Sequence, residues 1–167
     1  MNGQHRLHIG VGHEQAVRDA LTARGWFVQE WGQGVLDARV RQALNDRSPI
    51  VLWRWLPDLI AIKGQRVVLV DPKTDINKST PNFSIEISAI QAHCGMRFLG
   101  LRIVYVFEDM TCNTPENLEP VKWWMPDPGR DRVAAGGSGT PFALVRKSDQ
   151  VPLDTWFGSP AHSVAAE

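Results

Sequence analysis

Three residues near the middle of the chain combine side chains that can hold a metal ion and activate water. Asp58 follows Pro57, and Asp71 stands two residues before Lys73, so two carboxylates and one ammonium group flank apolar runs. Carboxylate oxygens are the ligands that Mg²⁺ prefers in proteins, and Mg²⁺ keeps several coordination places for water or phosphate oxygens. A lysine beside such a group can assist an attacking water. These residue types indicate a hydrolytic centre.

The segment that carries these residues predicts a β-hairpin. Its sequence, LPDLIAIKGQRVVLVDPKT, places two apolar runs around Gly64 and Gln65. Glycine at the first central position is typical of a type II′ turn. In that register Asp58 stands directly opposite Asp71, and Lys73 shares their face because side chains alternate along a strand. Opposed like charges destabilise a hairpin by up to about 1 kcal/mol, so we expect a cation to lie beside them.

A divalent cation would offset this repulsion more completely than Lys73 alone. Asp58 and Asp71 would bind Mg²⁺, for which Mn²⁺ could substitute, and the backbone carbonyl of Pro72 would supply a further oxygen. Lys73 would assist the water that attacks a phosphodiester, while the metal stabilises the developing charge. The alternative is that Asp71 and Lys73 are only the solvated end of a strand, since an acid-x-Lys after Pro-Asp also arises by chance.

The rest of the chain predicts one mixed α/β domain. Helical spacing of apolar residues favours helices at 12–24, at 35–45 and within 83–100, the last with Ser84 as its N-cap. Apolar β-forming runs favour strands at 26–31, 50–62, 66–73, 101–107, 121–125 and 141–147. Residues 111–120 are expected to be a loop, and 151–158 a closing turn packed by Trp156 and Phe157. The core would end near residue 110. Residues 111–167 would form an irregular extension packed on it, with a disordered tail.

The composition argues against several other classes of protein. Hydrophobic residues make up 43% of the chain and charged residues 22%, as in average soluble domains. No apolar run approaches the roughly 20 residues of a membrane span, and the N-terminus lacks the apolar stretch of a secretory signal. Cys94 and Cys112 are too few for a disulfide framework. We therefore expect a cytoplasmic protein with no membrane partner.

Pro57-Asp58 and Asp71-Pro72-Lys73 resemble the two halves of the motif of the PD-(D/E)XK nuclease superfamily. The predicted elements over residues 12–107 also resemble that family's core, and the chain looks most like archaeal Holliday-junction resolvases and related phage or restriction-type nucleases. The resemblance implies a restriction endonuclease-like fold, with a mixed central β-sheet flanked by helices. It also implies an Mg²⁺-dependent deoxyribonuclease of a phage or mobile element, an endonuclease rather than an exonuclease.

The resemblance implies roles for residues outside the motif. Glu14 occupies the place of a first-helix glutamate that often supports the metal, although a glutamate in a first helical turn is also favoured by the helix dipole. Gln91 lies where some relatives carry a glutamine that faces the metal. Contacts with DNA phosphates are expected from the loop after Lys73 and from the insertion at 32–55, namely from Lys78, Ser79, Thr80, Arg39, Arg41 and Arg54. Many relatives act on DNA as homodimers.

One departure and one alternative function stay open. Pro72 is uncommon at the x position, because proline removes a ladder donor and favours an edge strand or a bend. The alternative to a nuclease is a non-catalytic nucleic-acid-binding or interaction module on the same fold. Metal binding that depends on Asp58 would separate the two.

Overall fold

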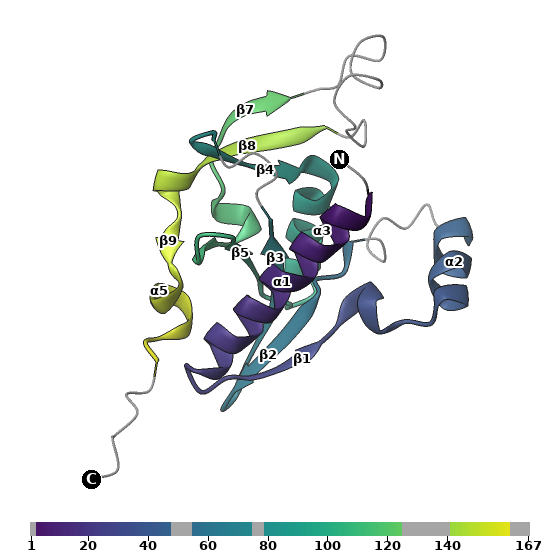
Figure 1. Cartoon of the computed structure of the whole chain (residues 1–167), viewed down its shortest axis with the longest axis horizontal. Helices are drawn as coiled ribbons and strands as arrows, with labels where there is room; N and C mark the ends of the chain where they lie inside the picture. Colours follow the sequence, from purple (N-terminus) through teal and green to yellow (C-terminus); the bar gives the residue numbers. More distant parts are fainter. Residues whose placement is uncertain (1–2, 48–54, 75–78, 125–140, 161–167) are drawn as a thin grey trace.

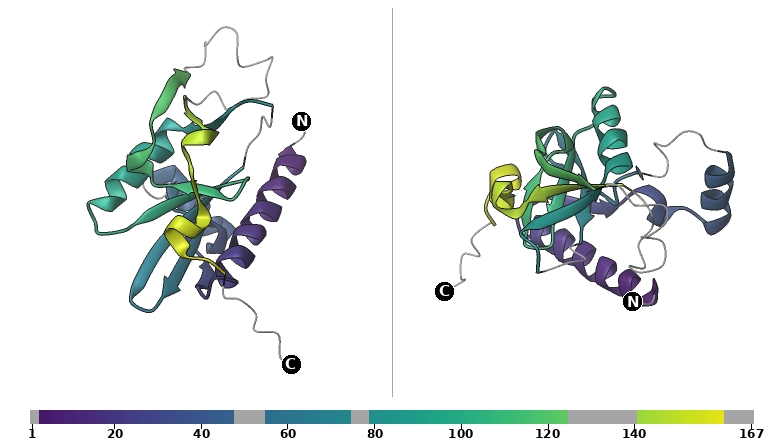
Figure 2. Two further views of the ribbon diagram at one scale, coloured as in Figure 1. Left: turned by 90° about the vertical axis from the view of Figure 1, so that its left-hand side faces the viewer. Right: turned by 90° about the horizontal axis from the view of Figure 1, so that it is seen from above.

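A six-stranded mixed sheet forms the centre of the molecule, with α1 against one face and α3 against the other (Figures 1 and 2). The structure, a computed structural model, describes residues 3–47, 55–74, 79–124 and 141–160. The order of the sheet is β1-β2-β3-β5-β6-β9. Its strands are β1 (Phe27–Glu30), β2 (Leu59–Lys63), β3 (Arg66–Lys73), β5 (Ile103–Phe107), β6 (Thr111–Asn113) and β9 (Val151–Pro152).

A second, three-stranded sheet lies at one end of the first, in the order β4-β8-β7 (Figure 1). Its strands are β4 (Asn82–Glu86), β8 (Phe142–Arg146) and β7 (Pro120–Trp124). The helices are α1 (Gly3–Thr22), α2 (Ala38–Arg47), α3 (Ile87–Arg97) and α5 (Leu153–Phe157), with short 3₁₀ helices η1 (Gly32–Val35), η3 (Pro115–Asn117) and η4 (Lys147–Asp149). The mixed α/β architecture predicted from the sequence is confirmed. No helix among the described residues is long and apolar enough to cross a membrane.

Side-chain alternation along the central strands builds two cores. Val68 and Val70 of β3 pack towards α1, in one cluster with Val17 and Leu21 of that helix. Leu69, between them, belongs to the other cluster, which contains Met96 of α3, Ile103, Tyr105 and Phe107. All five side chains of β5 are buried, as expected for a continuous apolar strand covered on both faces. Alternation therefore sends Asp71, two residues after Leu69, to the α3 face.

The predicted register of the hairpin is confirmed. Leu59 pairs with Val70 and Lys63 with Arg66, and the turn glycine Gly64 has φ +59°, as a type II′ turn requires. The predicted strand at 50–62 is too long, however. β2 begins only at Leu59, and residues 50–54 lie outside the described part of the chain.

Two prolines explain why the ladder stops at the Leu59–Val70 pair. The amide of Leu69 donates to the carbonyl of Arg102, so Val70 directs its own backbone groups to β2, and by alternation Pro72 does too. The residue that this register would place opposite Pro72 is Pro57. Neither proline has an N–H to donate. Pro72 thus lies in an interior strand rather than at a sheet edge, but at a level where its β2 neighbour has ended.

Two segments differ from the secondary structure that the sequence predicted. Ser84 is not a helix N-cap: it lies in β4, between the buried side chains of Phe83 and Ile85, and the N-cap of α3 is Glu86. A period of two over only five residues was hidden by the helical pattern that follows. The loop expected at 111–120 contains β6, which extends the sheet beyond β5 and is too short to show a period.

The C-terminal third contributes strands to both sheets. β6 and β9 continue the central sheet, and β8 pairs with β4. Phe157 is buried, and its ring meets that of Trp26 edge to face, with the centroids 5.2 Å apart. The indole N–H of Trp26 donates to the carbonyl of Phe157. The division of the chain at residue 110 stays a prediction.

Candidate functional site

The last residues of β3 form an ion pair between a buried carboxylate and a partly exposed lysine. Lys73 Nζ lies 2.7 Å from Asp71 Oδ2, and Asp71 is only 5% exposed. Lys73 Nζ also lies 5.1 Å from the centre of the Tyr105 ring, on the neighbouring strand. The sequence places these charges on one face by alternation, and burial makes their pairing necessary, because an isolated charge is costly away from water.

Asp58 completes a group of interacting charges from just beyond the start of β2. Its side chain is half-buried, and its backbone carbonyl accepts a hydrogen bond of 2.7 Å from the amide of Trp31. Burial, followed by the negative charge of Asp71, raises the pKa of Asp58 to about 7, although Lys73 opposes this shift. The two carboxylates therefore repel one another, as expected from the hairpin register.

Glu14 approaches the same group from the opposite side of the sheet. It lies on α1, is half-buried, and its charge contributes to the raised pKa of Asp58. Burial and then the charge of Glu30 raise the pKa of Glu14 itself, while Arg18 lowers it. Arg18 lies 4.0 Å from Glu14 and 2.8 Å from Glu30. α1 thus adds the carboxylate of Glu14 to the group, together with the guanidinium of Arg18, whose nearer partner is Glu30.

His93 is part of this site, although the sequence gave it no role there. Its ring is buried in α3, with Nδ1 2.8 Å from the Tyr105 hydroxyl and 3.6 Å from Asp71 Oδ2. Its Nε2 forms a hydrogen bond with the carbonyl of Trp55. Burial lowers the pKa of His93, so the ring is neutral near pH 7. The available signal was its helical spacing with Ala89 and Met96, which places a polar ring on the buried face.

The donor set is compatible with Mg²⁺ but small. Among the described residues, no three His, Cys, Asp or Glu side chains are grouped so that they could hold a metal ion. Mg²⁺ does not need three, because it commonly binds through one or two carboxylates and keeps water on its other positions. Asp58 and Asp71 supply two, and the carbonyl of Pro72 is a further oxygen at the end of the same strand. The repulsion that raises the pKa of Asp58 is the interaction that a cation would relieve.

Comparison with known proteins identifies the fold. No protein family model matches the chain, and no curated protein matches it by sequence. A solved structure does match: Hjc, a Holliday junction resolvase from Archaeoglobus fulgidus, superposes with a TM-score of 0.54 and 11% sequence identity, over 90% of this chain and 96% of that one. The chain has a restriction endonuclease-like fold. At this identity the match concerns the fold alone.

The structure describes some of the other residues that were predicted to contact the metal or DNA. Gln91 is exposed on α3, and the ring that reaches Asp71 from this helix is that of His93. Ser79 is exposed, whereas Thr80 donates to the carbonyl of Asn82. Arg39 and Arg41 are exposed on α2, which stands apart from the sheet (Figure 1). Lys78 and Arg54 lie outside the described residues.

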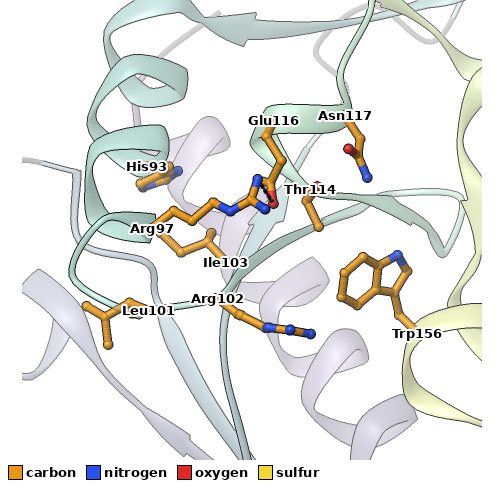
Figure 3. Close-up of a pocket in the computed structure, with 10 residues that line it drawn as sticks. His93, Arg97, Leu101, Arg102, Ile103, Thr114, Glu116, Asn117 and Trp156 are labelled. Atoms are coloured by element: carbon orange, nitrogen blue, oxygen red, sulfur yellow. Dashed lines mark ion pairs between the residues drawn. The ribbon is translucent and has the colours of Figure 1, made fainter.

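A pocket of about 380 Å³ lies beside the other end of β5, between the end of α3 and Trp156 (Figure 3). The ion pair of Arg97 and Glu116, 3.0 Å apart, crosses it. His93 contributes to its wall, but neither the carboxylates nor Lys73 line it. The pocket is therefore separate from the charged group at the end of β3.

Proposed function

We propose that this chain is a metal-dependent nuclease that hydrolyses DNA phosphodiester bonds. The observation that carries the proposal is the ion pair of the buried Asp71 with Lys73, with the carboxyl group of Asp58 electrostatically coupled to it. A purely structural ion pair would not require a second carboxylate beside it whose pKa is raised by burial and by the charge of the first. The restriction endonuclease-like fold supports the proposal by analogy.

Each charged side chain would have a distinct role. Asp58 and Asp71 would hold Mg²⁺, or Mn²⁺ in its place, with the carbonyl of Pro72. When bound, the metal would stabilise the negative charge that develops on the phosphodiester. Lys73, fixed by Asp71, would orient the attacking water by donating a hydrogen bond to it. Glu14 would support the site from α1.

The substrate is proposed to be DNA, cut internally. Arg39 and Arg41 are exposed on α2 and would contact phosphates, which would make binding strongly salt-dependent. The Archaeoglobus fulgidus neighbour is a Holliday junction resolvase, so branched DNA belongs among the substrates tested. Cutting two strands would be served by a homodimer, in which each copy supplies one site.

Cleavage of a DNA panel tests the proposal. Labelled duplex, single-stranded and four-way-junction DNA would be incubated with Mg²⁺, Mn²⁺ or a chelator. We expect Asp71→Asn to lower cleavage by at least about 100-fold while the protein stays folded, because the isosteric amide cannot provide a metal-binding charge. Lys73→Met should lower cleavage but retain metal binding.

Asp154→Asn is the matched control. Asp154 is also held by a cation, with Arg24 Nη2 2.6 Å away, but it lies in α5, beside the far edge of the sheet. Its loss should cost some stability and leave cleavage within about twofold. Full activity of a folded Asp71→Asn protein would overturn the proposal.

The second candidate is a non-catalytic module that binds nucleic acid or another protein. It is favoured by the close pairing of Lys73 with Asp71, because an ammonium group 2.7 Å away already offsets the charge of that carboxylate without a metal ion. Calorimetric titration with Mn²⁺ separates the candidates. Binding that is lost in Asp58→Asn supports the nuclease, whereas no binding, even with DNA present, supports the module.

A further inference from the structure

The position of Asp58 is not set by the hairpin ladder. The last pair is Leu59 with Val70, and the next hydrogen-bonded position would join Pro57 to Pro72, which have no N–H groups. Asp58 therefore lies beyond the last bond of the β2–β3 ladder, and the backbone pairing that still reaches it is the Trp31–Asp58 bond, which continues the register of β1 with β2. Yet its carboxyl group is close enough to Asp71 for that charge to raise its pKa. Contacts from other parts of the fold must hold the segment from Trp55 to Asp58 in place.

Three such contacts are present. The amide of Trp31 donates to the carbonyl of Asp58 over 2.7 Å. Gly32 packs so closely that a Cβ there would lie 2.5 Å from the carbonyl oxygen of Pro57. At the start of the segment, the carbonyl of Trp55 accepts a hydrogen bond from His93. The first two contacts come from the β1 side, and the third is the one that comes from α3.

The partners of His93 fix where its proton lies. A carbonyl oxygen can only accept, so Nε2 carries the hydrogen that is donated to Trp55. In the neutral ring Nδ1 is then an acceptor, and the Tyr105 hydroxyl at 2.8 Å is its donor. Asp71 Oδ2 is 3.6 Å from the same Nδ1. One edge of the ring thus meets the segment that carries Asp58, and the other meets the strand residues around Asp71.

We propose that His93 is a positioning residue that sets the separation of Asp58 and Asp71 by tying the Trp55 carbonyl to α3. The inference rests on the proposed function, because that separation matters for a shared cation. His93 acts through the backbone of the Trp55–Asp58 segment and touches neither substrate nor metal. Both ring nitrogens are already engaged, Nε2 with the Trp55 carbonyl and Nδ1 with the Tyr105 hydroxyl.

Two conservative variants distinguish the hydrogen bond made by Nε2 of His93 from the one made by Nδ1. In His93→Gln the amide nitrogen occupies roughly the place of Nε2 and can still donate to Trp55. In His93→Asn the amide group is shorter, stays near Nδ1 and cannot reach Trp55. If His93 acts through Trp55, Gln should restore the site and Asn should not. His93→Leu removes both hydrogen bonds and shows how the site behaves without either of them.

Amide hydrogen exchange reports how firmly the Trp55–Asp58 segment is held, and it does not depend on cleavage activity. The Trp31 amide, which donates to Asp58, should exchange at least about 10-fold faster in His93→Asn and His93→Leu than in the wild type, and within about threefold in His93→Gln. The Leu69 amide, bonded to Arg102 inside the sheet, is the internal control and should not change. Equal Trp31 exchange in all four proteins, or equal acceleration in Gln and Asn, would overturn the proposal.

Mn²⁺ affinity and cleavage kinetics measure how the His93 variants affect the proposed metal site. We expect about a 10-fold loss of Mn²⁺ affinity in His93→Asn, with kcat lowered more than KM is raised, and near-wild-type values in His93→Gln. Gln150→Leu, which breaks buried hydrogen bonds to Arg146 and Asn113 next to the edge strand β9, controls for lost stability and should leave both readouts unchanged. If the wild type neither binds Mn²⁺ nor cuts DNA, the proposed function fails, while the exchange pattern still decides the role of His93.

Discussion

The two ends of the β2–β3 hairpin are organised by different forces. At the turn, Lys63 pairs with Arg66 and Gly64 supplies the positive φ, so local hydrogen bonds and one glycine specify the geometry. At the open end the ladder stops, and Asp58 is positioned by contacts from elements remote in sequence. The turn end is exposed, whereas the open end holds the buried carboxylate of Asp71, paired with Lys73.

The difference shows how a strand end can become a site. Backbone carbonyls inside a ladder are already bonded, but the carbonyls of Trp55 and Asp58, outside it, are bonded by His93 and Trp31. Their donors come from α3 and from the residue after β1. Helix, strand and hairpin are therefore joined at the point where the carboxylates meet.

The largest difference in stability is expected between substitutions of Gly32, at the open end, and Gly64, at the turn. Gly32 and Gly64 both have positive φ, but a Cβ at Gly32 would lie 2.5 Å from Pro57 O, while nothing lies within 4 Å of one at Gly64. Gly64→Ala should cost about 1 kcal/mol of unfolding free energy, from backbone strain alone. Gly32→Ala should cost about 3 kcal/mol, because overpacking adds to that strain.

Urea denaturation and Mn²⁺ titration measure both variants. Gly32→Ala should also weaken Mn²⁺ binding by about 10-fold, since Pro57 and Asp58 must move, and Gly64→Ala should leave binding unchanged. Equal losses of stability and of metal affinity in the two variants would remove the distinction between the two ends.

An intermediate effect is expected from pH. Asp58 keeps its proton in the folded protein up to about pH 7, whereas in the unfolded chain it ionises near its ordinary pKa of 3.8. The folded state therefore binds more protons between these values, and stability should fall as pH rises through this window, by at most about 1.4 kcal/mol per unit.

Asp58→Asn isolates this contribution, because it removes the titrating group. The difference in urea stability between wild type and variant should change between about pH 5 and about pH 7 without metal, and added Mn²⁺ should restore wild-type stability at the upper end. A difference independent of pH would mean that burial and the charge of Asp71 together do not raise the pKa of Asp58.

The smallest effect is expected at Pro72. An added N–H in Pro72→Ala would face the level at which β2 has ended, so the unfolding free energy should change by less than about 1 kcal/mol. Val70→Pro, inside the ladder, removes a bonded donor and should cost more than about 2 kcal/mol. A gain in stability well above 1 kcal/mol in Pro72→Ala would indicate that the ladder can extend past Val70.

Local patterns account for what was predictable. Gly64 between two apolar runs gave the register, and the unbroken apolar run at 103–107 gave the buried strand β5. β4 was missed because Phe83 and Ile85 also fit the helical spacing of α3. The role of His93 was missed because its partners, Trp55 and Tyr105, are 38 and 12 residues away.

The sequence by itself determined that Asp71 and Lys73 share a face, because strand alternation is a property of the chain. The end of the ladder at Pro57 and Pro72 was not predicted, because the apolar run at 50–62 hid the end of β2. Only the tertiary structure decided that Glu14 and His93 approach this point from opposite faces of the sheet. It also decided how far Asp58 lies from Asp71. Where the β2–β3 ladder has ended, the backbone is positioned by His93 and by the Trp31 amide, which only the packed fold brings near.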